Sequence, residues 1–222
     1  MNIERSFTFA FKAPGAAGKL ALGGVFSLLF FTVFFAFVVM GYVMRVLCDA
    51  LEGRDAKLPE WKDIGELFNE GLMPMLVVLV YSFPLIVLVV LEQLVGMNLG
   101  LLVVFLSSRL VLLLILSVVL PLALIRFAVK SSMRAAFDFG EIFSFIRRNP
   151  GIYFTAWGLA LVVGLVSSLG LVALGIGIFF TSFVANVITV HLYAQAYRAA
   201  RPFTDDDQGE LRASMAIPPP LS

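Results

Sequence analysis

Charge is scarce in this chain. Only 14% of its 222 residues are Asp, Glu, Lys or Arg, whereas 60% are hydrophobic. A soluble domain of this length needs a polar surface that this composition does not supply. The mean hydropathy of +0.99 indicates instead a protein whose solvent is lipid. In lipid, helices that are apolar on every side are stable because their backbone groups are bonded internally. We therefore expect a multi-pass protein of the cytoplasmic (inner) membrane.

Residues that bind metals or form disulfides are equally rare. Cys48 is the only cysteine, and His191 is the only histidine, so neither an intrachain disulfide nor a His-rich metal site is available. The sequence also has no Gly-rich phosphate loop and no nucleophile beside an evident base. These absences argue against an enzyme, and we expect no catalytic residue, metal or cofactor. The net charge of +1 argues against a nucleic-acid partner.

Long uncharged stretches dominate what is present. A membrane-spanning helix needs about 20 mostly apolar residues. Five stretches qualify: Leu20–Met44, Gly71–Leu91, Leu110–Ile125 (which can extend back to Leu99), Gly151–Ser168 and Leu171–Tyr197. The sequence thus predicts an all-α polytopic membrane protein in which the last four stretches form two helical hairpins, with four crossings. Ser167-Ser168-Leu169-Gly170 offers almost no polar connector, which predicts a tight turn in the second hairpin.

The predicted organisation has five parts. Ile3, Phe7 and Phe11 recur every four residues and share one helical face, which is typical of an interfacial helix. The parts are an interfacial amphipathic helix (1–19), the first apolar segment (20–47), two repeats of an amphipathic helix plus a hairpin (48–130 and 131–201), and a disordered tail (202–222).

Lysine and arginine predict the orientation, because segments rich in them prefer the cytoplasm. The segments between hairpins are rich in both, whereas the hairpin tips hold only Arg109 or nothing. We therefore place the charged loops and the C-terminus in the cytoplasm. The first apolar stretch has positive charge at both ends, which leaves two alternatives open. It either spans the membrane or enters and leaves on one side, bending with the help of Gly23-Gly24 and Gly41.

One short phrase occurs twice, each time before a hairpin. Asp63-Ile64-Gly65-Glu66-Leu67-Phe68 returns 75 positions later as Asp138-Phe139-Gly140-Glu141-Ile142-Phe143. In each copy the aspartate can cap a helix, and the glutamate follows three residues later, as in a capping box. We interpret the two copies as surface-lying helices that precede the hairpins. The alternative is that their carboxylates bind a cation or a partner.

Two isolated charges lie within the first hairpin. Glu92 and Arg109 are the only charged residues between Glu70 and Arg126. Because a charge at the bilayer centre is costly, we expect the two to pair or to reach the outer interface. A substrate or proton path is the alternative.

Small and polar residues recur at helical spacing in the second hairpin. Small residues at every fourth position let helices approach closely, which predicts packing of the two arms or, alternatively, a dimer seam. The predicted packing stripes are Ala156, Ala160, Gly164 and Ser168 on one arm and Ala173, Gly177, Thr181 and Ala185 on the other. A polar stripe of Ser182, Asn186, Thr189 and Tyr193 predicts either cross-helix hydrogen bonds or a polar pocket.

Several segments resemble a known family. They are Gly41-Tyr42-Val43-Met44-Arg45-Val46-Leu47, Ala50-Leu51-Glu52-Gly53-Arg54 and Leu58-Pro59-Glu60-Trp61-Lys62 running into the first phrase. With Phe137-Asp138-Phe139 and Asn149-Pro150-Gly151-Ile152-Tyr153, these segments are similar to the bacterial and archaeal membrane family called domain of unknown function 4013. Relatives often carry a proline in the middle of the first apolar stretch, and this chain does not. The family has no established activity, so the resemblance implies a membrane topology and transfers no functional residue.

These observations predict a non-catalytic integral membrane protein: a scaffold, assembly factor or accessory subunit that contacts lipids and other membrane proteins or copies of itself. The alternative is a transporter of a small molecule, ion or lipid. A transporter predicts that Glu92, Arg109 or Asn186 lines a wet cavity between the two repeats. A scaffold predicts a dry bundle that offers an apolar face.

Overall fold

The computed structural model describes residues 15–28, 33–54, 57–95, 98–172 and 177–200. Most of these residues are helical, and none of them lies in a strand. The elements are α2 (Ala16–Leu28), α3 (Val33–Glu52), α4 (Ile64–Leu94), α5 (Leu99–Lys130), α6 (Met133–Ala136), α7 (Phe139–Arg148), α8 (Pro150–Ser168), η2 (Leu169–Val172) and α9 (Gly177–Ala200). The predicted interfacial helix lies mostly outside the described residues, as does the predicted disordered tail.

Five described helices, α3, α4, α5, α8 and α9, are long and apolar enough to cross a membrane. The prediction of an all-α polytopic membrane protein is therefore confirmed. Helices α4 and α5 contain 31 and 32 residues. At 1.5 Å per residue each is more than 45 Å long by rough estimate, well beyond the ~30 Å hydrocarbon core. Parts of this hairpin must therefore tilt or extend out of the core.

The first apolar stretch forms two helices, α2 and α3, and its two flanks lie together. Lys19 Nζ donates a hydrogen bond to the carbonyl of Leu58 at 2.5 Å, and Trp61 Nε1 donates one to the carbonyl of Lys19 at 2.8 Å. Helix α2 has 13 residues, which makes it about 20 Å long and too short to cross. This geometry favours the alternative in which the stretch enters and leaves on one side.

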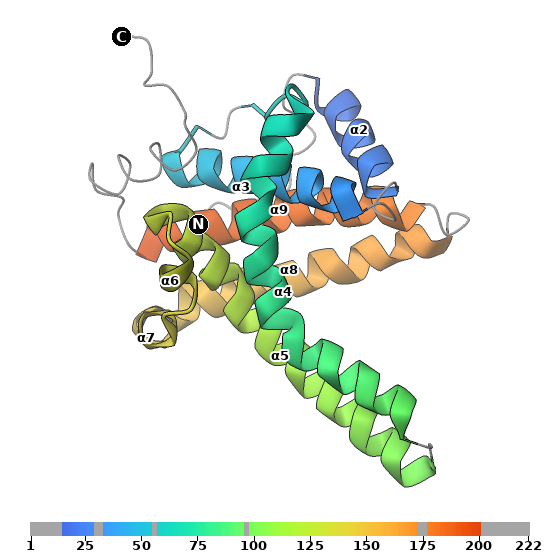
Figure 1. The fold of residues 1–222 in the computed structure, drawn as a ribbon. Coiled ribbons are helices and arrows are strands. Elements are labelled where there is room, and N and C mark those ends of the chain that lie inside the picture. Colours follow the sequence, from blue (N-terminus) through green and yellow to red (C-terminus); the bar gives the residue numbers. More distant parts are fainter. Residues whose placement is uncertain (1–14, 29–32, 55–56, 96–97, 173–176, 201–222) are drawn as a thin grey trace.

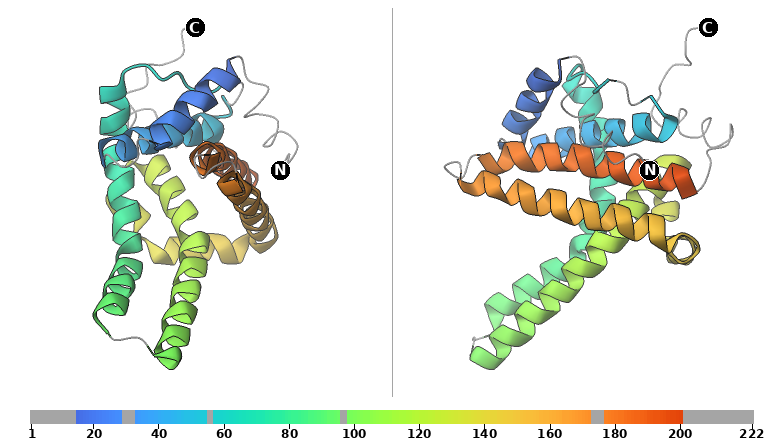
Figure 2. Two further views of the ribbon diagram at one scale, coloured as in Figure 1. Left: turned by 90° about the vertical axis from the view of Figure 1, so that its right-hand side faces the viewer. Right: turned by 180° about the vertical axis from the view of Figure 1, so that it is seen from behind.

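The two hairpins diverge from a common base. Helices α3, α8 and α9 run roughly alongside one another, while α4 crosses α3 and then continues with α5 away from them (Figure 1). Two further views show the far half of the α4–α5 hairpin standing clear of the rest of the protein (Figure 2). Helix α4 contains Pro74 and Pro84, which remove helical hydrogen bonds, and it changes direction along its length.

The core lies where α3 and α9 meet the other helices. On the α2 side, the rings of Tyr42 and Trp61 stack with centroids 4.0 Å apart, and Phe183 packs against both. On the α5 side, Leu51, Leu122 and Ile142 are fully buried in a second cluster. The hairpin tip is outside both clusters, and Leu94 and Leu99 there are 76% and 78% exposed.

The two copies of the repeated phrase differ in structure. The second copy forms a separate helix, α7, because Asn149-Pro150 interrupts the chain before α8. The first copy has no such break and runs directly into α4. The prediction of a separate surface helix before the first hairpin is therefore wrong.

Candidate functional site

The glutamate of each phrase lies beside an arginine from an earlier helix. In the first copy, Arg45 of α3 contacts Glu70 twice, from Nε at 2.5 Å and from Nη2 at 2.9 Å. Its Nη2 also donates to Glu66 at 2.7 Å. The side chains of Arg45 and Glu70 are 20% and 12% exposed. A fork of two parallel bonds from one guanidinium is the strong form of this interaction, so Arg45 firmly joins α3 to α4.

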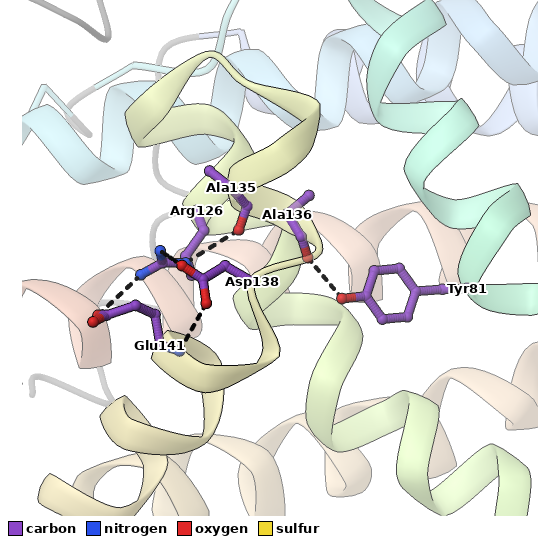
Figure 3. A network of polar contacts seen from close by, with 6 residues as sticks. All are labelled: Tyr81, Arg126, Ala135, Ala136, Asp138 and Glu141. Carbon is purple, nitrogen blue, oxygen red and sulfur yellow. Dashed lines mark hydrogen bonds and ion pairs between the residues drawn. The ribbon is translucent and has the colours of Figure 1, made fainter.

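In the second copy, Arg126 of α5 is held more loosely (Figure 3). Its Nε donates to the carbonyl of Ala135 at 3.2 Å, and its two Nη atoms lie 3.4 Å from Asp138 and 3.5 Å from Glu141. Charge-assisted contacts between nitrogen and oxygen are usually about 2.7–2.9 Å long. Arg126 is therefore close to two carboxylates without forming the tight fork seen at Arg45.

The predicted caps also differ between the copies. Asp138 accepts a hydrogen bond from the backbone N–H of Glu141 at 3.1 Å and caps α7. Asp63 precedes α4 with a left-handed backbone (φ 54°) and forms no side-chain cap bond, which contradicts that part of the prediction. A Cβ built on Gly65 has open space, and one on Gly140 meets only Asp138 Oδ1, at 3.4 Å. Neither glycine is required by packing.

Sequence reasoning missed Arg45 and Arg126. The two arginines lie 21 and 15 positions before Glu66 and Glu141, so a search for a constant spacing does not find them. Each is the first charged residue after an apolar run, and this position was the one sequence feature that could have identified both arginines. The Tyr81 hydroxyl was missed as well: it donates to the carbonyl of Ala136 at 2.6 Å and ties α4 to the segment beside Arg126 (Figure 3).

A cavity of about 350 Å³, called the interhelical cavity below, lies among four of the described helices. Helices α3, α4, α5 and α9 line it with mostly apolar side chains, including Met40, Met75 and Pro121. Three members of the predicted polar stripe contribute to its wall: Asn186, Thr189 and Tyr193. The fourth, Ser182, instead accepts a hydrogen bond from the hydroxyl of Ser167 on α8 at 3.4 Å.

Glu92 of α4 and Arg109 of α5 form an ion pair within the projecting hairpin. Their side chains are 11% and 35% exposed. Side chains on a helix slant toward its N-terminus, so Arg109 reaches from deeper in α5 toward the hairpin tip. Within the part of the chain that the structure describes, Arg109 Nε is buried and has no hydrogen-bond partner. The pair does not line the interhelical cavity.

The predicted packing stripes are only partly used. Helix α8 buries Tyr153, Ala156, Val163 and Ser167. Gly164 is exposed, and a Cβ built on it meets nothing within 4 Å. The seam therefore does not run through Gly164.

Other members of these stripes have separate outcomes. Ala160 packs against the core, whereas Ser168 is exposed and bonds within its own helix. On α9, Thr181 donates to the carbonyl of Ser167 at 2.7 Å and, with Ala185, lines a groove beside α8. A Cβ on Gly170 would lie 2.8 Å from the carbonyl oxygen of Gly177, so the arms meet closely there. Ala173 lies outside the described residues.

Among the described residues, no three His, Cys, Asp or Glu side chains gather as metal ligands would. The profile of the family described as "Protein of unknown function (DUF4013)" matches residues 25–176, about two thirds of the chain. No curated protein and no solved structure matches this chain. The family match contains the first phrase, both arginine clusters and the whole projecting hairpin. This chain therefore belongs to the DUF4013 family of proteins of unknown function.

Proposed function

We propose that this protein is a non-catalytic membrane subunit that docks a partner membrane protein through the projecting half of the α4–α5 hairpin. The observation that carries the proposal is the Glu92–Arg109 ion pair, which joins α4 to α5 in the half of the hairpin that no other described helix covers. The remaining surface of this half is apolar, with Val90, Val103 and Leu110 each at least half exposed.

Lipid alone is a poor environment for that pair. A guanidinium carries five N–H donors, and Glu92 engages Arg109 through one nitrogen. Hydrocarbon offers no acceptor for the remaining donors, and a polar group without a partner there costs several kcal/mol by rough estimate. A partner helix that presents a carboxylate, amide or carbonyl beside Arg109 would supply the acceptors and cover the apolar surface at the same time.

Site-specific photo-crosslinking in the native membrane tests this function. A photoreactive residue at Val103, on the exposed face of the hairpin, is compared with one at Leu165, which is similarly exposed on α8. We expect Val103 to yield one crosslinked membrane protein, which intact-assembly mass spectrometry then finds in fixed stoichiometry. Arg109→Leu should reduce that crosslink. Crosslinks only to lipid, or only to a second copy of this chain, would overturn the partner-subunit proposal.

The interhelical cavity favours a second candidate function, the binding or transport of an amphiphile. Its apolar wall suits a hydrocarbon chain, while Asn186, Thr189 and Tyr193 offer hydrogen bonds to a polar group at one side. Filling the cavity by Thr189→Trp should displace a co-purifying lipid or small molecule. Thr155→Trp, on the exposed face of α8, is the matched control. Equal retention by both variants would exclude this second function.

A further inference from the structure

A second pocket, of about 430 Å³, lies at the base of the protein beside Arg126. Three helices form it. Helix α5 contributes Arg126, α7 contributes Glu141, Ser144 and Arg148, and α9 contributes Tyr197. This pocket shares no lining residue with the interhelical cavity and is separate from the projecting half of the hairpin, so it is not part of the proposed partner-docking function.

The charges of this pocket favour an anion. Its lining holds two arginines and one glutamate, a net charge of +1. Arg126 is only 14% exposed and is positioned by the Ala135 carbonyl, yet its contacts with carboxylates are 3.4 and 3.5 Å long. Arg148 forms no ion pair with any other residue that the structure describes. Both guanidinium groups therefore keep N–H donors for a ligand, and the Ser144 hydroxyl adds another.

The contrast with Arg45 strengthens this point. Arg45 also precedes its phrase, at a different spacing, and its donors are engaged by Glu66 and Glu70 at 2.5–2.9 Å. The two carboxylates near Arg126 are Asp138 and Glu141, and Phe145 occupies the position 75 residues after Glu70, so the second cluster has no counterpart of Glu70. The second cluster therefore lacks the tight fork that Glu70 forms with Arg45, and an open pocket lies beside its arginine.

Helix α7 indicates where this pocket lies relative to a membrane. It buries Ile142 and Ile146 against the protein and leaves Phe139 and Phe143 about half exposed. Basic residues occupy its last turn. A short helix with exposed aromatic residues and basic residues is typical of the membrane interface, where lipid headgroups lie. Basic pockets between helices at this level bind the phosphates of anionic lipids.

We propose that the pocket between α5, α7 and α9 binds the phosphate group of an anionic lipid headgroup through Arg126 and Arg148. Arginine suits phosphate because its planar fork donates two parallel hydrogen bonds. Glu141 reaches Arg126 from the exposed side and competes with the phosphate for it. A soluble phosphate ester has the same recognition chemistry, so the experiment must distinguish the two sources.

The test uses the purified full-length protein in nanodiscs of phosphatidylcholine with a minority of phosphatidylglycerol. Native mass spectrometry then measures how much phosphatidylglycerol stays bound after transfer to a neutral detergent. Arg148→Gln should weaken retention roughly tenfold, since a hydrogen bond to a charged group is worth about one such factor or more. Arg147→Gln removes the same charge from the neighbouring position, which does not line the pocket, and should leave retention unchanged. Glu141→Gln should retain phosphatidylglycerol at least as well as the unaltered protein.

The outcomes separate the possibilities. Equal loss in Arg147→Gln and Arg148→Gln would overturn the proposal, because it would indicate general surface charge rather than a pocket. Retention of phosphatidylcholine equal to that of phosphatidylglycerol would also overturn it. Competition arms then test the source of the phosphate. Displacement of the lipid by glycerol 3-phosphate at low concentration would support the phosphate site but assign it to a soluble ester. Displacement only by short-chain phosphatidylglycerol would assign it to a lipid.

Discussion

Gly41 of α3 and Gly71 of α4 bring two helix backbones into direct contact. A Cβ on Gly41 would lie 1.9 Å from the carbonyl oxygen of Leu67, and one on Gly71 would lie 1.8 Å from that of Phe37. Small residues allow such close approach between membrane helices. The Arg45–Glu70 pair lies beside the same crossing, so steric fit and charge together determine how α4 leaves the body of the protein.

Gly41→Ala should destabilise the protein because the added methyl group collides with backbone rather than with a movable side chain. Overpacking in a well-packed core costs about 1–3 kcal/mol, and here the backbone must shift. We expect a clear fall in the thermal unfolding midpoint in mild detergent. Gly164→Ala is the matched control, and its midpoint should not fall, because a Cβ there meets nothing within 4 Å. Equal midpoints for the two variants would contradict this account of the crossing.

Arg45→Gln should leave Glu70 largely buried without its partner. We expect a loss of roughly 2 kcal/mol in unfolding free energy, less than the about 3–5 kcal/mol typical of a fully buried pair. Chemical denaturation in mixed micelles measures it. The double variant Arg45→Gln/Glu70→Gln should recover part of the loss, since the only charge left without Arg45 is that of Glu66, which is exposed. If the double variant is no more stable than Arg45→Gln alone, the unpaired charge of Glu70 is not the cause of the lost stability.

Lys62→Gln provides the exposed counterpart to that experiment. Lys62 donates a hydrogen bond to Glu60, which lowers the pKa of that carboxyl, but both side chains are exposed. Because water and salt screen such pairs, the variant should have the same unfolding midpoint as the unaltered protein, both at neutral pH and in mild acid. A midpoint that fell with this substitution would mean that the Leu58–Lys62 connection is packed more tightly than its exposure indicates.

Glu92→Gln should reduce the amount of folded protein in the membrane because it leaves Arg109 alone in the hairpin. A lone arginine at the centre of a membrane helix costs about 2.5–3.5 kcal/mol on insertion scales. The double variant Glu92→Leu/Arg109→Leu removes both charges and should restore the membrane level, while losing any partner that the ion pair recognises. Quantitative immunoblotting of membrane fractions measures the membrane level, and blotting for the co-purified partner measures its capture. A double variant that still captures the partner would show that the apolar surface alone is recognised.

The sequence predicted the helices well and their mutual packing poorly, for a physical reason. Long uncharged stretches predict spans because the cost of exposing backbone to lipid is general. Which face of an all-round apolar helix packs inward is not encoded in hydropathy, so the small-residue spacing included Gly164, where no other described helix packs closely. The contact that matters, Gly41 against Gly71, joins residues from different helices and has no periodic signal.

The candidate site shows the same division. Glu92 and Arg109 could be paired from the sequence because so few charges compete for either residue. Arg45 and Arg126 could not, because their carboxylate partners lie across a turn of variable length. The phrase predicted a separate surface helix in both copies. Only the second copy forms one, α7, because Pro150 follows it and begins a new helix, whereas the first copy continues into α4.

The contact of Lys19 with Leu58 and Trp61 predicts that both flanks of the first apolar stretch lie on one side of the membrane. Cysteine labelling in intact cells measures this. Cys48 is buried, so Cys48→Ala provides a silent background. Single cysteines are introduced at three exposed positions, Ala17, Lys57 and Asn98. A membrane-impermeant maleimide should label Asn98→Cys in intact cells, and Ala17→Cys and Lys57→Cys only after the cells are opened. Labelling of Ala17→Cys but not Lys57→Cys in intact cells would mean that the stretch spans the membrane, and the hydrogen bonds of Lys19 could then not form.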